Sequence, residues 1–214
     1  VAVANQVAGH LTLLLGRARD ALREPLTAPL WQEGNYPLGL QPGTVADGDV
    51  DGDGRVDLVA TSSGANTVQV LEGAGDGAFR LGLQLPVSAG ARSVALADLT
   101  GDRKPELVSA GSTGNLVDVR LNQSAPGAVA FGLLPNLAVN RPFRVLFADL
   151  DSDGVPDLLV SVDNMGQSSG QLQVLPGQRS GAFGVPLVIN LPAGITDVAA
   201  GDMDGDGKPD VVAA

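Results

Sequence analysis

The stretch that decides the fold of this 214-residue chain reads Asp49-Val50-Asp51-Gly52-Asp53-Gly54-Arg55-Val56-Asp57. It places carboxylates at positions 1, 3, 5 and 9 of a nine-residue loop, and glycine at position 6. Ca²⁺ takes about six to eight oxygen ligands, and alternate aspartates in a tightly curled loop can direct several oxygens to one point. Glycine at position 6 allows the sharp turn. The stretch therefore predicts a calcium-binding loop.

The same loop pattern occurs three more times. The copies read Asp98-Leu99-Thr100-Gly101-Asp102-Arg103-Lys104-Pro105-Glu106, Asp149-Leu150-Asp151-Ser152-Asp153-Gly154-Val155-Pro156-Asp157 and Asp202-Met203-Asp204-Gly205-Asp206-Gly207-Lys208-Pro209-Asp210. Their first aspartates are spaced by 49, 51 and 53 residues, and a period of this length is typical of a repeat architecture. Aspartate and glycine also form ordinary turns. So many like charges in one turn, however, repel each other unless a cation is present.

Each loop is followed by the same succession of segments. An apolar run comes first, then a turn, and then a strand of alternating character such as residues 68–71. Alternation predicts a strand with one face buried and the other in water. A turn ending in Phe79, Phe131 or Phe183 follows, and a looser segment leads to the strand before the next loop. We expect about four strands per period, with the acidic loop between the first and the second.

Four antiparallel strands in about 50 residues form one blade of a β-propeller, in which blades repeat radially and cover each other's edges. We predict an all-β propeller segment with whole blades at about residues 37–90, 91–140 and 141–192 and partial blades at 1–36 and 193–214. Residues 11–26 align without gaps on residues 172–187, so we expect the chain to begin just past a further acidic loop. Its ends either close a four-bladed ring or belong to an arc of a larger ring.

The D-x-D-x-D-G-x-x-D-L loops and the G-x-F turns at Phe79 and Phe183 resemble the FG-GAP and VCBS-type repeats, the calcium-loop blades also found in the integrin α-subunit head. The resemblance covers essentially the whole chain. It implies a ring of seven blades, sometimes eight, and therefore favours an arc of a larger propeller whose other blades belong to a longer chain. It also implies a secreted or cell-surface protein, because members are adhesion proteins, lectin-like binders or appendages of larger enzymes.

The resemblance further implies the ligands of each metal site, which are the side chains at positions 1, 3, 5 and 9 and the backbone carbonyl at position 7. The second loop departs from this pattern: Thr100 replaces a carboxylate, and Arg103 replaces glycine and adds a positive charge. We predict weak or absent calcium binding there. The expected ligands are Asp49, Asp51, Asp53, Asp57 and the Arg55 carbonyl; Asp98, Asp102 and Glu106; Asp149, Asp151, Asp153, Asp157 and the Val155 carbonyl; and Asp202, Asp204, Asp206, Asp210 and the Lys208 carbonyl.

Composition limits the function classes. The formal net charge of −11 argues against nucleic-acid binding, because a phosphate backbone requires a basic face. Fifteen of the 24 acidic residues lie in the four loops, so the acidity is explained as a supply of metal ligands. The absence of cysteine excludes disulfides and thiolate chemistry. No apolar run approaches roughly 18 residues, so we expect no membrane insertion by this segment. Calcium sites of modest affinity fill more readily outside the cell, which favours an extracellular location.

Other motifs have plainer interpretations. Residues 166–170 match the G-x-S-x-G string of a nucleophile elbow, but the all-β pattern and a single histidine, His10, argue for a loop. Residues 122–124 form a glycosylation sequon. Trp31 and Tyr36 lie in a loop-like stretch and either stack on a sugar or join neighbouring blades; we favour the second role. Asp118 and Asp163 have no evident partners.

The sequence therefore favours a calcium-binding scaffold, and not an enzyme, with structural Ca²⁺ and an unidentified protein or glycan partner. Its expected role is adhesion or ligand recognition. Two alternatives stay open: a carbohydrate-binding lectin with pockets between blades, and the non-catalytic propeller segment of a polysaccharide-degrading enzyme.

Overall fold

A computed structural model describes the chain except for residues 1, 6–8, 17–30, 163–168 and 193. The described residues form 18 β-strands and no helix, and every strand pairing is antiparallel. The predicted all-β class is confirmed. Within the described ranges, no helix has the length and apolar character needed to cross a membrane.

Three consecutive sheets repeat one topology, in which neighbouring strands along the chain pair in order. In the second sheet a short extra strand also pairs with the third one. The strands are β4 (Pro42–Gly48), β5 (Asp57–Ser62), β6 (Thr67–Gly73) and β7 (Phe79–Pro86); β8 (Ala91–Ala97), β9 (Glu106–Gly111), β10 (Leu116–Asn122), β11 (Phe131–Leu133) and β12 (Leu137–Ala138); and β13 (Pro142–Ala148), β14 (Asp157–Val162), β15 (Gly170–Leu175) and β16 (Leu187–Leu191).

Two smaller sheets flank these three. The first contains β1 (Ala2–Asn5), β2 (His10–Gly16) and β3 (Trp31–Pro37), and the last contains β17 (Val198–Gly201) and β18 (Asp210–Ala213). The prediction of a loop-like stretch around Trp31 and Tyr36 is wrong. Residues 31–37 pair with β2 along their whole length, from Gly16 opposite Trp31 to His10 opposite Pro37.

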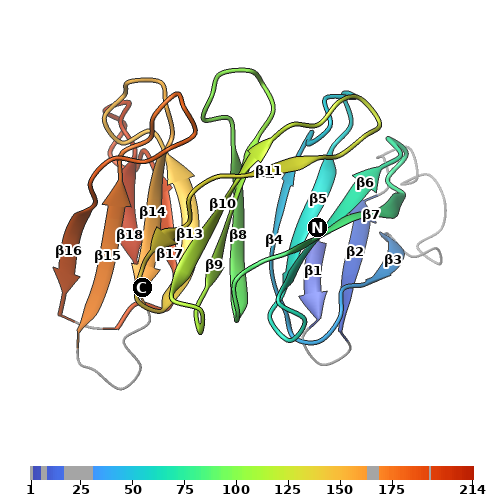
Figure 1. Cartoon of the computed structure of the whole chain (residues 1–214), viewed down its shortest axis with the longest axis horizontal. Helices are drawn as coiled ribbons and strands as arrows, with labels where there is room; N and C mark the ends of the chain where they lie inside the picture. Colours follow the sequence, from blue (N-terminus) through green and yellow to red (C-terminus); the bar gives the residue numbers. More distant parts are fainter. Residues whose placement is uncertain (1, 6–8, 17–30, 163–168, 193) are drawn as a thin grey trace.

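The sheets stand side by side in an open row, and the described residues form no closed ring (Figure 1). The first strands of successive sheets are neighbours: β4 contacts β8, β8 contacts β13 and β13 contacts β17. We call these four the inner strands. Four-stranded antiparallel sheets stacked in this way are consistent with propeller blades.

Apolar cores fill the spaces between neighbouring sheets. Val59, Val68 and Val70 of the first full sheet pack with Val94 and Leu107 of the second. A larger cluster joins the second sheet to the third, and further clusters join the outer two sheets to their neighbours. All six residues of β5, β9 and β14 are buried, because these second strands are covered on both faces.

The expectation of one wet face on the alternating strands is wrong for β6 and β10. In β6 the polar Gln69 is only 7% exposed, between two fully buried valines. Its Nε2 donates hydrogen bonds to the carbonyls of Val70 and Gly82 at 2.8 and 3.0 Å. Because neighbouring sheets cover both faces of β6, the polar side chain at an alternate position forms its hydrogen bonds with groups inside the protein.

Candidate metal-binding loops

Each acidic loop connects the inner strand of a sheet to its second strand, as predicted. The loops follow β4, β8, β13 and β17, so all four lie at the same ends of the sheets, the upper edge of Figure 1. Each loop is held between two paired strands, which fixes where its first and last carboxylates lie. In the first loop, Gly48 is opposite Asp57 in the ladder.

The first loop curls around its own first carboxylate. Asp49 accepts hydrogen bonds from the backbone N–H groups of Gly52, Asp53 and Gly54 at 2.8, 3.1 and 2.9 Å. The Asp53 carboxylate accepts from the N–H of Arg55 at 2.9 Å. These bonds orient both carboxylates before any ion is bound.

The other three loops repeat this pattern. The first aspartate accepts from the N–H of position 6 in each, at 2.8, 3.0 and 2.9 Å. The residue at position 5 accepts from the N–H of position 7 at 2.8 to 2.9 Å. Positions 4 and 6 have positive φ in all four loops. The sequence prediction noted this requirement at position 6 only; the signal for position 4 was glycine in three of the four copies.

The carboxylate at position 9 accepts from the N–H of position 2 in all four loops, and in the first and third it also ties the loop to the rest of its sheet. Asp57 Oδ2 accepts from the N–H of Val50 at 2.8 Å, and Oδ1 accepts from the N–H of Gly73, the last residue of β6, at 2.8 Å. Burial raises the pKa of Asp57, and the two backbone hydrogen bonds partly offset this. This structural role was missed by the sequence reasoning, which gave position 9 only the role of ligand.

Three loops bring aspartate oxygens together. In each, one oxygen from each of three residues lies within 4.8 Å of the other two. Two oxygens bound to one Ca²⁺ at about 2.4 Å can be at most about 5 Å apart, so this spacing fits a shared calcium ion. All of these donors are hard carboxylate oxygens, the type that Ca²⁺ prefers. The sets are Asp49, Asp51 and Asp53; Asp149, Asp151 and Asp157; and Asp202, Asp204 and Asp206.

The remaining predicted ligands are placed as follows. Asp57, Asp153 and Asp210 lie in the same loops but outside these sets. Arg55, Val155 and Lys208 occupy position 7, where their N–H groups donate to position 5. Ligation through their carbonyls stays a prediction.

The second loop has the same curled backbone as the others, but its carboxylate oxygens do not gather at one point. Its acidic residues Asp98, Asp102 and Glu106 do not meet the 4.8 Å spacing that the other three loops satisfy within the described chain. Glu106 is fully buried, and Oε2 accepts from the N–H of Leu99 at 2.8 Å. Burial raises the pKa of Glu106, with hydrogen bonding partly offsetting the effect. Weak or absent calcium binding at this loop stays a prediction.

The second sheet supports the first loop from the side. Asp51 is 2% exposed, and its Oδ2 accepts from the N–H of Gly127, in the segment between β10 and β11. The Asn122 side chain donates from Nδ2 to the carbonyls of Val50 and Pro105 at 2.9 and 3.0 Å. Asn122 is therefore buried and engaged, so the sequon at residues 122–124 does not present its amide for glycosylation.

The repeated loops are matched by known proteins. Residues 49–109 and 149–213 match the FG-GAP-like repeat family. The chain belongs to this family. The FG-GAP-like chain also resembles a crystal structure described as a functionally unknown protein from Desulfotomaculum acetoxidans DSM 771, with a TM-score of 0.58 and 14% identity. The match covers 91% of this chain and 56% of that one, so this chain spans little more than half of that structure. No curated protein matches.

Other predicted features of the FG-GAP-like chain have the following outcomes. The Tyr36 hydroxyl accepts from the N–H of Phe79 at 3.1 Å, and the two rings meet edge to face at 6.1 Å, so Tyr36 joins two sheets as favoured. Asp118 has partners, contrary to expectation: Arg120 at 3.5 Å and the N–H of Ser88 at 2.8 Å. Asp163, residues 166–168 of the elbow-like string and the side chain of Trp31 lie outside the described part.

Proposed function

We propose that this FG-GAP-like chain is a calcium-stabilised, non-catalytic scaffold of a secreted or cell-surface protein that mediates adhesion or ligand recognition. The observation that carries the proposal is the gathering of three aspartate oxygens within 4.8 Å in each of three loops. Like charges held this close repel each other, and a divalent cation offsets that repulsion. The backbone hydrogen bonds described above hold the carboxylates in place for such an ion.

The role of the ion in this proposal is structural. Bound Ca²⁺ would supply positive charge and cross-link the hairpin of the inner and second strands. In the first loop the chain would extend this effect to the next sheet, because Asp51 also accepts from Gly127. A ligand that binds only the folded state raises stability by mass action, by about 2.7 kcal/mol at a concentration of 100 times Kd.

The finer features of the architecture also belong to the proposal. We place the described sheets in an arc of a seven-bladed propeller whose other blades come from a longer chain. The open row of sheets and the 56% coverage of the matched structure support this placement. The partner is a protein or glycan, and the charge of −11 disfavours nucleic acid.

Calorimetric titration of the chelator-treated protein with CaCl₂ tests the proposal, alongside thermal melting with and without Ca²⁺. We expect about three sites, and a rise in melting temperature of several degrees per occupied site of moderate affinity. Asp149→Asn should remove one site. Asp76→Asn is the matched control, because this carboxylate accepts one N–H in a turn outside the acidic loops. No heat of binding and no change in melting temperature would overturn the proposal.

A further inference from the structure

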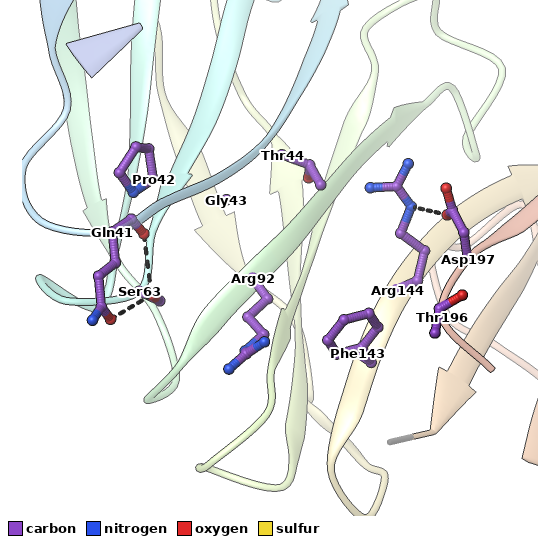
Figure 2. Close-up of a pocket in the computed structure, with 10 residues that line it drawn as sticks. All are labelled: Gln41, Pro42, Gly43, Thr44, Ser63, Arg92, Phe143, Arg144, Thr196 and Asp197. Atoms are coloured by element: carbon purple, nitrogen blue, oxygen red, sulfur yellow. Dashed lines mark hydrogen bonds and ion pairs between the residues drawn. The ribbon is translucent and has the colours of Figure 1, made fainter. Parts of the chain in front are cut away.

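A cavity of about 400 Å³, with its lining residues drawn in Figure 2, lies where the inner strands begin, which are the ends of the sheets opposite the acidic loops. It is lined by the beginnings of three inner strands, β4, β8 and β13, and by residues 196–197, which precede β17. Its volume falls within the range of about 300 to 1,000 Å³ that is typical of small-molecule sites. The cavity is separate from the acidic loops and has no part in the calcium site.

Irregular pairing of the inner strands shapes the cavity. The register of β4, β8 and β13 shifts at the same place in each, and the residues without a pairing partner include Gly43, Arg92 and Phe143. Such bulges re-aim side chains. A Cβ at Gly43 would lie 2.2 Å from the Arg92 carbonyl oxygen, so only glycine permits this approach of β4 to β8.

Hydroxyl groups fix the spacing of the inner strands beside the cavity. Thr44 Oγ1 accepts from the N–H of Val94 at 2.9 Å, and Ser93 Oγ accepts from the N–H of Val145 at 3.1 Å. Each bond joins one inner strand to the next. The cavity wall is therefore held by hydrogen bonds between side-chain hydroxyls and the backbone, and does not depend on a ligand.

The cavity carries positive charge in an acidic protein. The Arg92 guanidinium lies 5.4 Å from the centre of the Phe143 ring and forms no ion pair with any described residue. Arg144 Nε pairs with Asp197 Oδ1 at 2.9 Å, and its two terminal nitrogens have no hydrogen bond to a described residue. Contact with an aromatic face orients a guanidinium and leaves its N–H donors available.

The acidic loops are too far away to neutralise these arginines. An inner strand of seven residues, such as β4, spans about 20 Å at roughly 3.3 Å per residue. The Debye length in physiological salt is about 8 Å, so the field of the loops is largely screened at the cavity. An anion entering the cavity therefore meets the arginines and one local carboxylate, Asp197.

We propose that this cavity binds an acidic sugar, with the carboxylate of a hexuronic acid residue against the Arg92 guanidinium. An arginine fork matches a carboxylate with two parallel hydrogen bonds. Gln41, Thr44 and Thr196 line the same cavity (Figure 2). Thr44 Oγ1 accepts from Val94, Gln41 Oε1 accepts from Ser63, and Thr196 Oγ1 donates to the Ala214 carbonyl. The Thr44 hydroxyl and the Gln41 amide can therefore still donate to a sugar hydroxyl, and the Thr196 hydroxyl can accept from one. The inference deepens the recognition role proposed above and rests on it.

Calorimetric titration in buffer containing Ca²⁺, with tri-galacturonic acid as the probe and maltotriose as its neutral counterpart, tests this site. We expect heat of binding with the acidic trisaccharide only, and weaker binding as salt is raised. Arg92→Gln should weaken binding about tenfold or more, the loss expected for one charge-assisted contact. Arg92→Lys should retain part of the affinity, because the charge remains and the fork is lost.

Arg80→Gln is the matched control, since Arg80 is exposed on β7 and pairs with Glu72, outside the cavity. Melting curves of all variants establish that each is folded. Equal binding of the two trisaccharides, unchanged affinity in Arg92→Gln, or binding of a glutamate decamer without binding of tri-galacturonic acid would each overturn the proposal. Calcium binding without sugar binding would refute this inference and leave the calcium-stabilised scaffold standing. Sugar binding by a protein that shows no calcium binding in its own titration would support the recognition role and this site, and would refute the calcium part of the scaffold proposal.

Discussion

Two residues in the acidic loops hold a left-handed backbone conformation without being glycine. Arg103, at position 6 of the second loop, has φ 69°, and Ser152, at position 4 of the third, has φ 61°. The six other positions of this kind are glycines with φ between 75° and 85°. A side chain in this region costs about 1 to 2 kcal/mol through the contact of its Cβ with the backbone. The second and third loops therefore store strain that the first and fourth do not.

Relief of this strain is measurable. We expect Arg103→Gly to raise the free energy of unfolding by about 0.5 to 1 kcal/mol, less than the full cost because glycine also makes the unfolded chain more flexible. Urea unfolding without Ca²⁺ measures it. Gly54→Ala is the converse control: nothing lies within 4 Å of the added Cβ, so a loss of about 1 kcal/mol would come from φ alone. A destabilised Arg103→Gly protein would contradict the strain argument.

The buried pair of Asp118 and Arg120 makes a second prediction. Their side chains are 3% and 7% exposed, and Asp118 also accepts from the N–H of Ser88 and from Asn136 Nδ2. Asp118→Ala would leave a buried guanidinium unpaired, so we expect a loss of about 3 kcal/mol in the free energy of unfolding. Asp118→Asn keeps an acceptor oxygen and should lose less. A loss below about 1 kcal/mol for Asp118→Ala in denaturant unfolding would show that the pair adds little.

At the scale of the element, the spacing of the acidic loops predicted the strand arrangement better than the alternation of apolar and polar residues predicted burial. The four repeats predicted that each acidic loop lies between the first and second strands of a sheet. A loop of the same length in every repeat leads the chain back along the strand that it has just left. The alternating pattern predicted exposed side chains at Gln69 and Asp118, and both are buried. The sequence looks the same whether a polar residue faces water or a buried hydrogen-bond network. The strand at residues 31–37 was missed because Gly34, Asn35 and Pro37 are turn-forming residues that the pairing with β2 overrides.

The candidate site was predictable only within each loop. The carboxylates that gather at one point belong to a single nine-residue stretch, so their spacing reveals them. The contact of Asp51 with Gly127 joins residues 76 apart in the chain, and no local pattern carries it. The cavity at Arg92 and Phe143 was missed for the same reason, since its residues come from four inner strands or their approaches.

The loops also predict how stability depends on pH. Burial raises the pKa of both Asp57 and Glu106 in the folded chain. A raised pKa means that the folded state holds its proton more tightly than the unfolded chain does. Without metal, the stabilising contribution of these two groups is therefore complete below the ordinary carboxyl pKa of about 4, and is lost as pH rises through the raised values. In chelator, we expect melting temperature to rise as pH falls from 7 toward 4.

Saturating Ca²⁺ should reverse that trend. Protons compete with the ion for the carboxylates, so metal binding and its stabilisation weaken as pH falls. Melting temperatures at pH 4 and pH 7, each with chelator and with Ca²⁺, make the comparison. The same sign of pH dependence in both conditions would contradict the proposed occupancy of the loops.

At the scale of the whole molecule, stability lies between the sheets as much as within them. The apolar clusters join neighbouring sheets, and hydroxyl bonds join successive inner strands. In repeat proteins, nearest-neighbour interfaces supply a large part of the stability. A local change at one loop therefore reaches the adjacent sheet when a direct contact connects them.

Asn122 provides that contact for the first loop. Its Nδ2 donates to the Val50 carbonyl in the first loop and to the Pro105 carbonyl at the end of the second. We expect Asn122→Ala to lower the free energy of unfolding by about 2 kcal/mol, since the buried Val50 carbonyl and the half-buried Pro105 carbonyl lose a donor. It should also weaken calcium binding at one site, because the first loop keeps the Gly127 bond to Asp51 but loses the Asn122 bond to Val50.

Denaturant unfolding and calcium calorimetry on the same samples measure the two effects. Asn190→Ala is the matched control, because Asn190 is exposed on β16 and its side chain accepts one hydrogen bond from the described residues, donated by Gln171. It should change neither quantity. If Asn122→Ala lowers stability but leaves every calcium affinity unchanged, the Asn122 bonds stabilise the fold and have no part in shaping the first loop for the ion.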